Sequence, residues 1–181
     1  LGCAAAYVLA SGDRTILRSF GRPEQGAMRL PLLLGGGVFL LLLGGYTLLS
    51  PWLDLSAISG NLQAREGFTA ATFPLAALYI TFGNSLLEEL FFRGFAFLAL
   101  YRSGYKKLAW TFSAIAFALY HVSIMDGWFH PALLVLLTSG LACAGLLFNA
   151  LDAKSQTIWP GWLVHMGANL AINTIALHLW G

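Results

Sequence analysis

Charged residues are scarce in this chain: lysine and arginine number 10, aspartate and glutamate number 8, and together they make up 10% of its 181 residues. A soluble domain carries about 25% charged residues, so this chain has too little polar surface to cover a water-soluble globule. Hydrophobic residues make up 58% of the sequence. The composition therefore predicts one all-α domain, residues 1–181, built as a polytopic transmembrane helix bundle.

Three further absences narrow the function. The net charge of +2 comes with no long basic run and no RNA-binding motif, so nucleic acid is not expected as a partner. The two cysteines, Cys3 and Cys143, lie in apolar stretches without a CxxC motif or a disulfide framework, and we interpret both as small packing residues. No HExxH motif is present, so the familiar zinc-protease helix is absent.

Long apolar stretches account for most of the chain. A membrane-spanning helix needs about 20 apolar residues. Residues 1–10 are interpreted as the end of an apolar helix whose beginning lies upstream of this chain. Five further segments are expected to be membrane helices, at residues 30–50, 68–101, 108–123, 129–151 and 158–180.

The loops between these segments differ in charge, and the difference predicts an orientation. Lysine and arginine are concentrated in alternate loops, at residues 11–29, 102–107 and 152–157, which places those loops in the cytoplasm. The intervening loops, 51–67 and 124–128, carry one arginine between them. The chain is therefore expected to be a multi-pass protein embedded in the lipid bilayer of a bacterial cytoplasmic membrane.

Three charged residues lie where the membrane interior is expected. Glu88, Glu89 and Arg93 are flanked by residues 67–87 and 94–101, which carry no charge. A charge in such a position costs roughly 2.5–3.5 kcal/mol on insertion scales and is a functional candidate by default.

Helix geometry places several polar residues at overlapping depths. With a rise of about 1.5 Å per residue, Glu88 lies roughly 18–20 Å from the cytoplasmic end of its segment, and His121 lies at about 20 Å. His165 lies at about 10 Å and Asn169 at about 16 Å. The four residues come from three segments, and their agreement in depth predicts one shared site within the membrane.

Spacing indicates separate roles for the two glutamates. Glu89 and Arg93 are four residues apart, share a helix face and are expected to form a supporting ion pair. Glu88 points about 100° away on the same turn, with Asn84 one turn before it. An unpaired carboxylate at this depth can act as a general base toward water. The alternative is a Glu–Arg pair that braces the helix beside a spare glutamate.

His121 and the pair His165–Asn169 supply the remaining candidates. Phe117 lies one turn before His121 and can hold its imidazole in place. His165 and Asn169 share a helix face, and Asn173 extends that polar stripe. Two such donors can form an oxyanion hole, and interhelical hydrogen bonding is the alternative.

Three motifs thus follow one another on apolar segments: Glu-Glu-x-x-x-Arg at 88–93, Phe-x-x-x-His at 117–121 and His-x-x-x-Asn at 165–169. Together they resemble the CAAX protease and bacteriocin-processing (CPBP) family, also called the Abi family of intramembrane proteases. The resemblance covers residues 68–175, the expected protease core, and leaves the N-terminal residues 1–67 outside it. No motif position departs from the family pattern.

The resemblance implies an intramembrane endopeptidase. It implies that Glu88 and His121 activate water, that His165 and Asn169 stabilise the oxyanion, and that the neighbouring ion pair supports the site. Family members include type II CAAX prenyl endopeptidases, and bacterial members are linked to peptide maturation and bacteriocin immunity. The motifs therefore leave open whether the substrate is a peptide or a prenylated protein.

Metal use also stays open at this point. Glu88, His121 and His165 could bind Zn²⁺ with one position left for water, or they could act without a metal. The resemblance to the prenyl endopeptidases favours the metal-free mechanism, so no cofactor is expected. Two rival functions remain: a non-catalytic immunity protein that binds a peptide or lipid, and a small proton-coupled transporter. No paired half-repeat supports transport.

Overall fold

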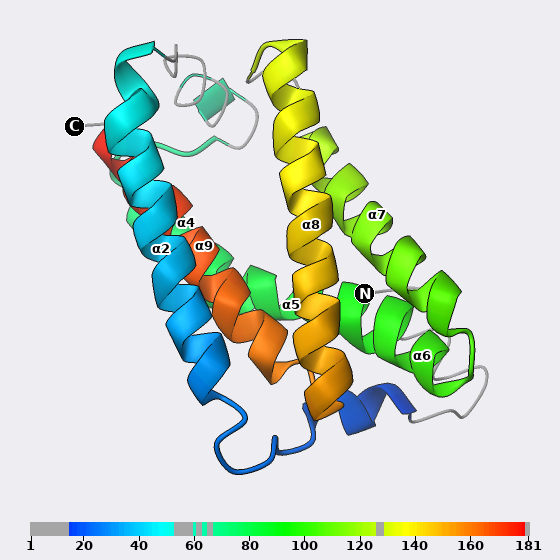
Figure 1. Cartoon of the computed structure of the whole chain (residues 1–181). Coiled ribbons are helices and arrows are strands. Elements are labelled where there is room, and N and C mark those ends of the chain that lie inside the picture. Colours follow the sequence, from blue (N-terminus) through cyan, green and yellow to red (C-terminus); the bar gives the residue numbers. More distant parts are fainter. Residues whose placement is uncertain (1–14, 53–59, 61–62, 65–66, 126–128, 180–181) are drawn as a thin grey trace.

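The computed structural model describes residues 15–52, 60, 63–64, 67–125 and 129–179. All secondary-structure elements in these residues are helices (Figure 1). The expected all-α bundle is therefore confirmed. The expected helix end at residues 1–10 lies outside the described residues. Outside the long central helix, the elements are η1 (Thr15–Phe20), α2 (Arg29–Leu49), η2 (Ser50–Trp52), α7 (Lys106–Met125), α8 (Pro131–Ser155) and α9 (Trp159–Leu179).

The central helix, Phe73–Arg102, is 30 residues long and carries the two glutamates. It begins after Thr72, and a proline occupies its first turn, where the missing N–H is tolerated. Its consecutive parts are α4 (Phe73–Leu78), η3 (Tyr79–Asn84), α5 (Ser85–Glu89), η4 (Leu90–Ala99) and α6 (Leu100–Arg102). Both η3 and η4 are π-helical, a geometry that is frequent at functional sites. The Glu88–Glu89 turn thus lies between two widened stretches of one helix.

Four helices among the described residues are long and apolar enough to cross a membrane: Arg29–Trp52, Phe73–Arg102, Lys106–Met125 and Pro131–Ser155. The fifth expected span, 158–180, forms the 21-residue helix α9 but is not among these four. Its polar residues lower its apolarity, because His165, Asn169 and Asn173 recur along it at every fourth position. Of the five segments expected to be membrane helices, four are long and apolar enough to cross a membrane, and the fifth forms the less apolar helix α9.

The helices form two pairs joined by the central helix. In Figure 1, α2 lies beside α9 and α7 lies beside α8, and these two pairs also share the most extensive contacts. The start of α2, the turn between α6 and α7, and the turn between α8 and α9 lie at the same end of the bundle. These are the segments whose positive charge predicted a cytoplasmic location, so the arrangement agrees with that topology.

Two glycines allow α2 and α9 to approach closely. A Cβ atom at Gly167 would overlap the backbone of Gly35, and a Cβ atom at Gly35 would lie 3.0 Å from the carbonyl oxygen of Leu163. Small residues at helix contacts are the usual means of close packing in membranes. Gly35 and Gly167 are therefore the positions at which α2 and α9 pack most closely.

Polar residues are buried at the centre of the bundle, and many large apolar residues are exposed on its outside. Glu89 and Arg93 are fully buried, whereas leucines on α2 such as Leu33 and Leu41 are more than 70% exposed. This reverses the pattern of a soluble protein and fits an apolar solvent around the bundle. Cys143 is exposed, so its interpretation as a packing residue is wrong, while Cys3 lies outside the described residues.

Candidate active site

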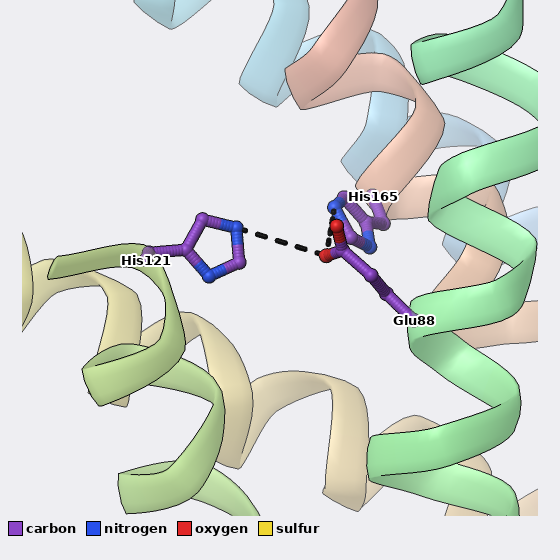
Figure 2. Close-up of side chains that lie close together, drawn as sticks. All are labelled: Glu88, His121 and His165. Carbon is purple, nitrogen blue, oxygen red and sulfur yellow. Dashed lines mark ion pairs between the residues drawn. The ribbon is translucent and has the colours of Figure 1, made fainter. Parts of the chain in front are cut away.

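Three of the four predicted site residues meet at the centre of the bundle. Glu88 comes from α5, His121 from α7 and His165 from α9 (Figure 2). Oε2 of Glu88 lies 3.7 Å from Nε2 of His121 and 3.8 Å from Nε2 of His165. One carboxylate oxygen thus faces two imidazoles across a gap wide enough for a shared third atom.

The second oxygen of the Glu88 carboxylate is held by its own helix. Nδ2 of Asn84 donates a hydrogen bond of 2.5 Å to Oε1 of Glu88. Glu88 is only 8% exposed, yet it borders a cavity of about 280 Å³ that is partly open to the surroundings. The cavity is lined by Asn84, Leu87, Glu88, Phe91, Phe92 and Tyr120. The carboxylate is therefore fixed at one oxygen, and its side chain borders a space that can admit a ligand.

The imidazole of His121 is oriented by its own helix. Its Nδ1 lies 2.9 Å from the carbonyl oxygen of Phe117, and the Phe117 and His121 rings lie 4.4 Å apart. A carbonyl oxygen only accepts hydrogen bonds, so Nδ1 carries the proton. In the neutral ring, Nε2 is then an acceptor that faces Glu88. The expected role of Phe117 in holding this imidazole is consistent with both contacts.

Glu89 holds the other imidazole. Oε1 of Glu89 lies 2.8 Å from Nδ1 of His165 and 3.3 Å from Nη1 of Arg93. The expected Glu89–Arg93 ion pair is confirmed, and the hydrogen bond from His165 is an additional contact that spacing alone did not reveal. A carboxylate on one ring nitrogen fixes the tautomer and the orientation of the ring. Glu89 thereby directs Nε2 of His165 toward Glu88.

Arg93 is enclosed by aromatic rings. Its guanidinium carbon lies 4.0 Å from the ring centre of Phe117 and 4.8 Å from that of Phe148. Arginine stacked on aromatic faces gains cation–π attraction, which is strongest where water is excluded. The ion pair is therefore embedded in the packing that also supports the two histidines.

The fourth predicted residue, Asn169, is directed elsewhere in this structure. Its Nδ2 donates to the carbonyl oxygen of Ile80 at 3.3 Å. Asn173, one turn further, donates to the Ala77 carbonyl at 3.1 Å and to the Thr81 hydroxyl at 2.9 Å. Both asparagines thus tie α9 to the central helix. Each amide has two N–H groups, so the bond to Ile80 leaves Asn169 a second donor.

Sequence reasoning missed two residues of α8 that border the site. Phe148 stacks on the imidazole of His165, with ring centres 5.7 Å apart and planes 23° apart. Asp152 is fully buried and accepts a hydrogen bond of 2.8 Å from the N–H of Gly161. The charge pattern had placed Asp152 in a loop beside Lys154. Nothing in its immediate sequence separates a buried acid in the last helical turn from a solvated loop acid.

The central cluster has the donor set of a catalytic zinc site. One carboxylate oxygen of Glu88 and one nitrogen each from His121 and His165 lie within 4.8 Å of one another. Two histidines and a glutamate with an open fourth position form a known catalytic zinc arrangement. The outer nitrogens of both rings are already hydrogen-bonded, as metal-binding histidines require. The three residues therefore fit a metal ion, and they fit a metal-free general base equally well.

Comparison with known families agrees with the motifs. The family model described as type II CAAX prenyl endopeptidase Rce1-like matches residues 70–171, which is more than half of the chain and includes all three motifs. Neither the search of curated proteins nor the search of solved structures finds a match. The match confirms the resemblance to CAAX proteases that the three motifs indicate. The chain therefore belongs to the Rce1-like family of type II CAAX prenyl endopeptidases.

Proposed function

We propose that this protein is an intramembrane endopeptidase that hydrolyses a peptide bond with water activated by Glu88. One observation carries the proposal: a buried carboxylate oxygen lies 3.7 and 3.8 Å from two oriented imidazoles and its side chain borders a cavity. A general base must be within hydrogen-bond reach of the proton that it removes. A water molecule in the space between the three side chains would satisfy that condition.

In the proposed first step, Oε2 of Glu88 removes a proton from this water, and the oxygen attacks the carbonyl carbon of the substrate. His121 accepts the second water hydrogen at its unprotonated Nε2 and so orients the nucleophile. Hydrogen bonds from positioned donors to the developing oxyanion are worth about 2.7–4 kcal/mol each in known enzymes. We assign this role to His165 and to the second N–H of Asn169.

In the second step, the tetrahedral intermediate collapses and the bond from carbon to nitrogen breaks. The proton held by Glu88 passes to the leaving amine, and the carboxylate is restored. His165 can donate to the oxyanion while its Nδ1–H is bound to Glu89, because an imidazolium carries a proton on each nitrogen. Glu89 and Arg93 act indirectly in this scheme by orienting His165.

A metal ion, if bound, would be held by Glu88, His121 and His165 and would supply Lewis-acid polarisation of the bound water. We favour the metal-free mechanism, because Glu88 then remains free to act as the base. Preincubation with a chelator separates the two possibilities. Unchanged activity after removal of metal supports the metal-free scheme, and loss of activity that added Zn²⁺ restores would replace it.

For the substrate, we propose the C-terminal segment of a prenylated protein, which is the substrate class named for the family. A prenyl chain would lie in the bilayer and bring the adjacent peptide to the depth of Glu88. Peptide maturation remains the alternative within the same chemistry. A matched pair of peptides, identical except for the farnesyl group on cysteine, distinguishes them.

The proposal is tested with purified protein in liposomes, the farnesylated peptide and water enriched in ¹⁸O. Cleavage that places one ¹⁸O atom in the new carboxylate is expected, because the nucleophile is water. Saturable binding of either peptide without cleavage would instead support the non-catalytic immunity or peptide-binding function. Cleavage of the unprenylated peptide at an equal rate would exclude recognition of the prenyl group.

A further inference from the structure

Helix α8 carries none of the three motifs, yet its Phe148 contacts motif residues of other helices and its Asp152 binds the start of α9. Phe148 and Asp152 are four residues apart and share one face of α8. Phe148 lies against the rings of Phe117 and His165, at 6.0 and 5.7 Å between centres. Asp152 lies one turn further toward the end of α8, where α9 begins (Figure 1).

Asp152 satisfies a backbone donor at the start of α9. Gly161 is the third residue of α9, and the first four N–H groups of a helix have no partner within the helix. Oδ1 of Asp152 accepts the Gly161 N–H at 2.8 Å. A carboxylate at this end is also favoured by the helix dipole. Asp152 is therefore a capping residue supplied by a different helix.

The cap is placed one turn before a predicted site residue. His165 follows Gly161 by four residues, so the two lie on the same face of α9. The height and rotation of the first turn of α9 therefore determine where the imidazole meets Glu89. The hydrogen bonds at both ends of this segment are short: 2.8 Å between Asp152 and Gly161, and 2.8 Å between His165 and Glu89.

Gly161 itself provides a second, independent observation. A Cβ atom on Gly161 would lie 2.8 Å from Oδ2 of Asp152 and 3.1 Å from Oε2 of Glu89. Both oxygens are buried and have no hydrogen-bond partner among the described residues. Two carboxyl groups from different helices thus occupy the space that any side chain at position 161 would need.

We propose that Asp152 is a positioning residue: it acts through Gly161 to set the place of the His165 imidazole against Glu89 and Glu88. The inference rests on the proposed peptidase function for its kinetic consequence, and on geometry alone for its structural consequence. Asp152 and Gly161 do not line the cavity beside Glu88. Their effect is therefore expected on turnover rather than on substrate binding.

Three substitutions test the connection. Asp152→Ala removes the cap, and Gly161→Ala introduces a methyl group between the two carboxyl groups. Both are expected to lower kcat by about 10–100-fold, the usual effect of removing a residue that orients a catalytic histidine, with KM unchanged. Asp152→Asn retains an oxygen that can accept the Gly161 N–H, so it is expected to keep most of kcat.

Asn149→Ala is the matched control. Asn149 is also buried on α8, but it contacts α7: its Oδ1 accepts from the hydroxyl of Ser113 at 3.1 Å, and its Nδ2 donates to the Trp110 carbonyl at 3.3 Å. It should lower the melting temperature as Asp152→Ala does while leaving kcat near the wild-type value. Equal loss of kcat in Asn149→Ala and Asp152→Ala would overturn the positioning role.

A spectroscopic measurement tests the same proposal without activity. In protein labelled with ¹⁵N-histidine, the Nδ1–H proton of His165 should give a downfield signal, assigned by its loss in His165→Ala. Asp152→Ala and Gly161→Ala are expected to shift or broaden this signal, whereas Asp152→Asn and Asn149→Ala preserve it. An unchanged signal in Asp152→Ala would overturn the inference. Absence of peptidase activity in the wild type would overturn only the proposed function.

Discussion

Helices α2 and α9 are both 21 residues long and lie side by side, but they differ in what they bury. The buried residues of α2 are Pro31 and Gly35, and most of its leucines are exposed. By contrast, α9 buries His165 and Asn173 and binds the central helix through three polar side chains. Helix α2 is thus a mainly apolar neighbour, whereas α9 carries two of the proposed catalytic residues.

This difference shows that polar residues determine which face of a membrane helix turns toward the interior of the bundle. A polar side chain facing lipid is costly, so the polar stripe of α9 must turn toward the central helix. The apolar surface of α2 sets no such direction, and α2 approaches α9 by close packing at Gly35. Substitutions on α2 and α9 should therefore differ in their effects on kcat and on the melting temperature.

The largest difference in kcat is expected between His165→Ala on α9 and Leu41→Ala on α2. Loss of the His165 imidazole removes the proposed oxyanion donor, and kcat should fall by about 10²–10³-fold. Leu41 is 72% exposed, so its truncation should leave kcat unchanged. Steady-state cleavage of the farnesylated peptide by both variants measures the difference. Equal activity in the two variants would remove His165 from the site.

The largest effect on stability is expected from the loss of Arg93 on the central helix. Arg93→Ala leaves the buried Glu89 without its cation, at a cost of about 3–5 kcal/mol, and it also removes the contacts with Phe117 and Phe148. A lower melting temperature in detergent is expected. Arg29→Ala is the control, since Arg29 is exposed at the start of α2. A melting temperature that matches the control, together with a loss of activity, would indicate a direct catalytic role for Arg93.

The close packing between α2 and α9 predicts a loss of stability of intermediate size when a glycine at the contact is enlarged. Gly167→Ala would place a methyl group against the backbone of Gly35, and such overpacking costs about 1–3 kcal/mol. Gly37→Ala is the matched control, because a Cβ atom there meets nothing within 4 Å. The control should be neutral or slightly stabilising, since alanine favours helix more than glycine does. Thermal unfolding in detergent that ranks the two variants in the opposite order would contradict the close contact.

The smallest predicted difference separates the two asparagines of α9. Loss of an interhelical hydrogen bond costs on average about 0.6 kcal/mol in a membrane protein. Asn169→Ala loses one such bond and Asn173→Ala loses two, so both should lower the melting temperature slightly, and Asn173→Ala should lower it more. Only Asn169→Ala should also lower kcat, if the second N–H of Asn169 binds the oxyanion. The same kcat in both variants would assign Asn169 to interhelical bonding alone.

Local spacing explains which features the sequence predicts well. The Glu89–Arg93 pair and the shared face of His165 and Asn169 depend only on helix periodicity, which composition and hydropathy already indicate. The meeting of Glu88, His121 and His165 follows from their depths in three adjacent helices. The sequence can therefore predict the main helices and the central cluster.

Contacts between distant segments explain what the sequence does not predict. The burial of Asp152 depends on the path by which α9 begins beside the end of α8, which local pattern does not specify. The carbonyl of Ile80, in the π-helical η3, accepts hydrogen bonds from the Asn169 side chain and from the Ser85 N–H, and local spacing does not specify this pairing. These features require the tertiary arrangement of α8, α9 and the central helix.

The central claim, that Glu88 is the base which activates water, is tested most directly by Glu88→Gln. This change keeps the shape of the side chain and removes its basicity. Single-turnover cleavage of the farnesylated peptide is measured for Glu88→Gln and for Glu24→Gln, an exposed glutamate outside the site. We predict a fall in rate of about 10²–10⁴-fold for Glu88→Gln, with the melting temperature maintained, and no change for Glu24→Gln. Near-wild-type cleavage by a folded Glu88→Gln protein would contradict the account.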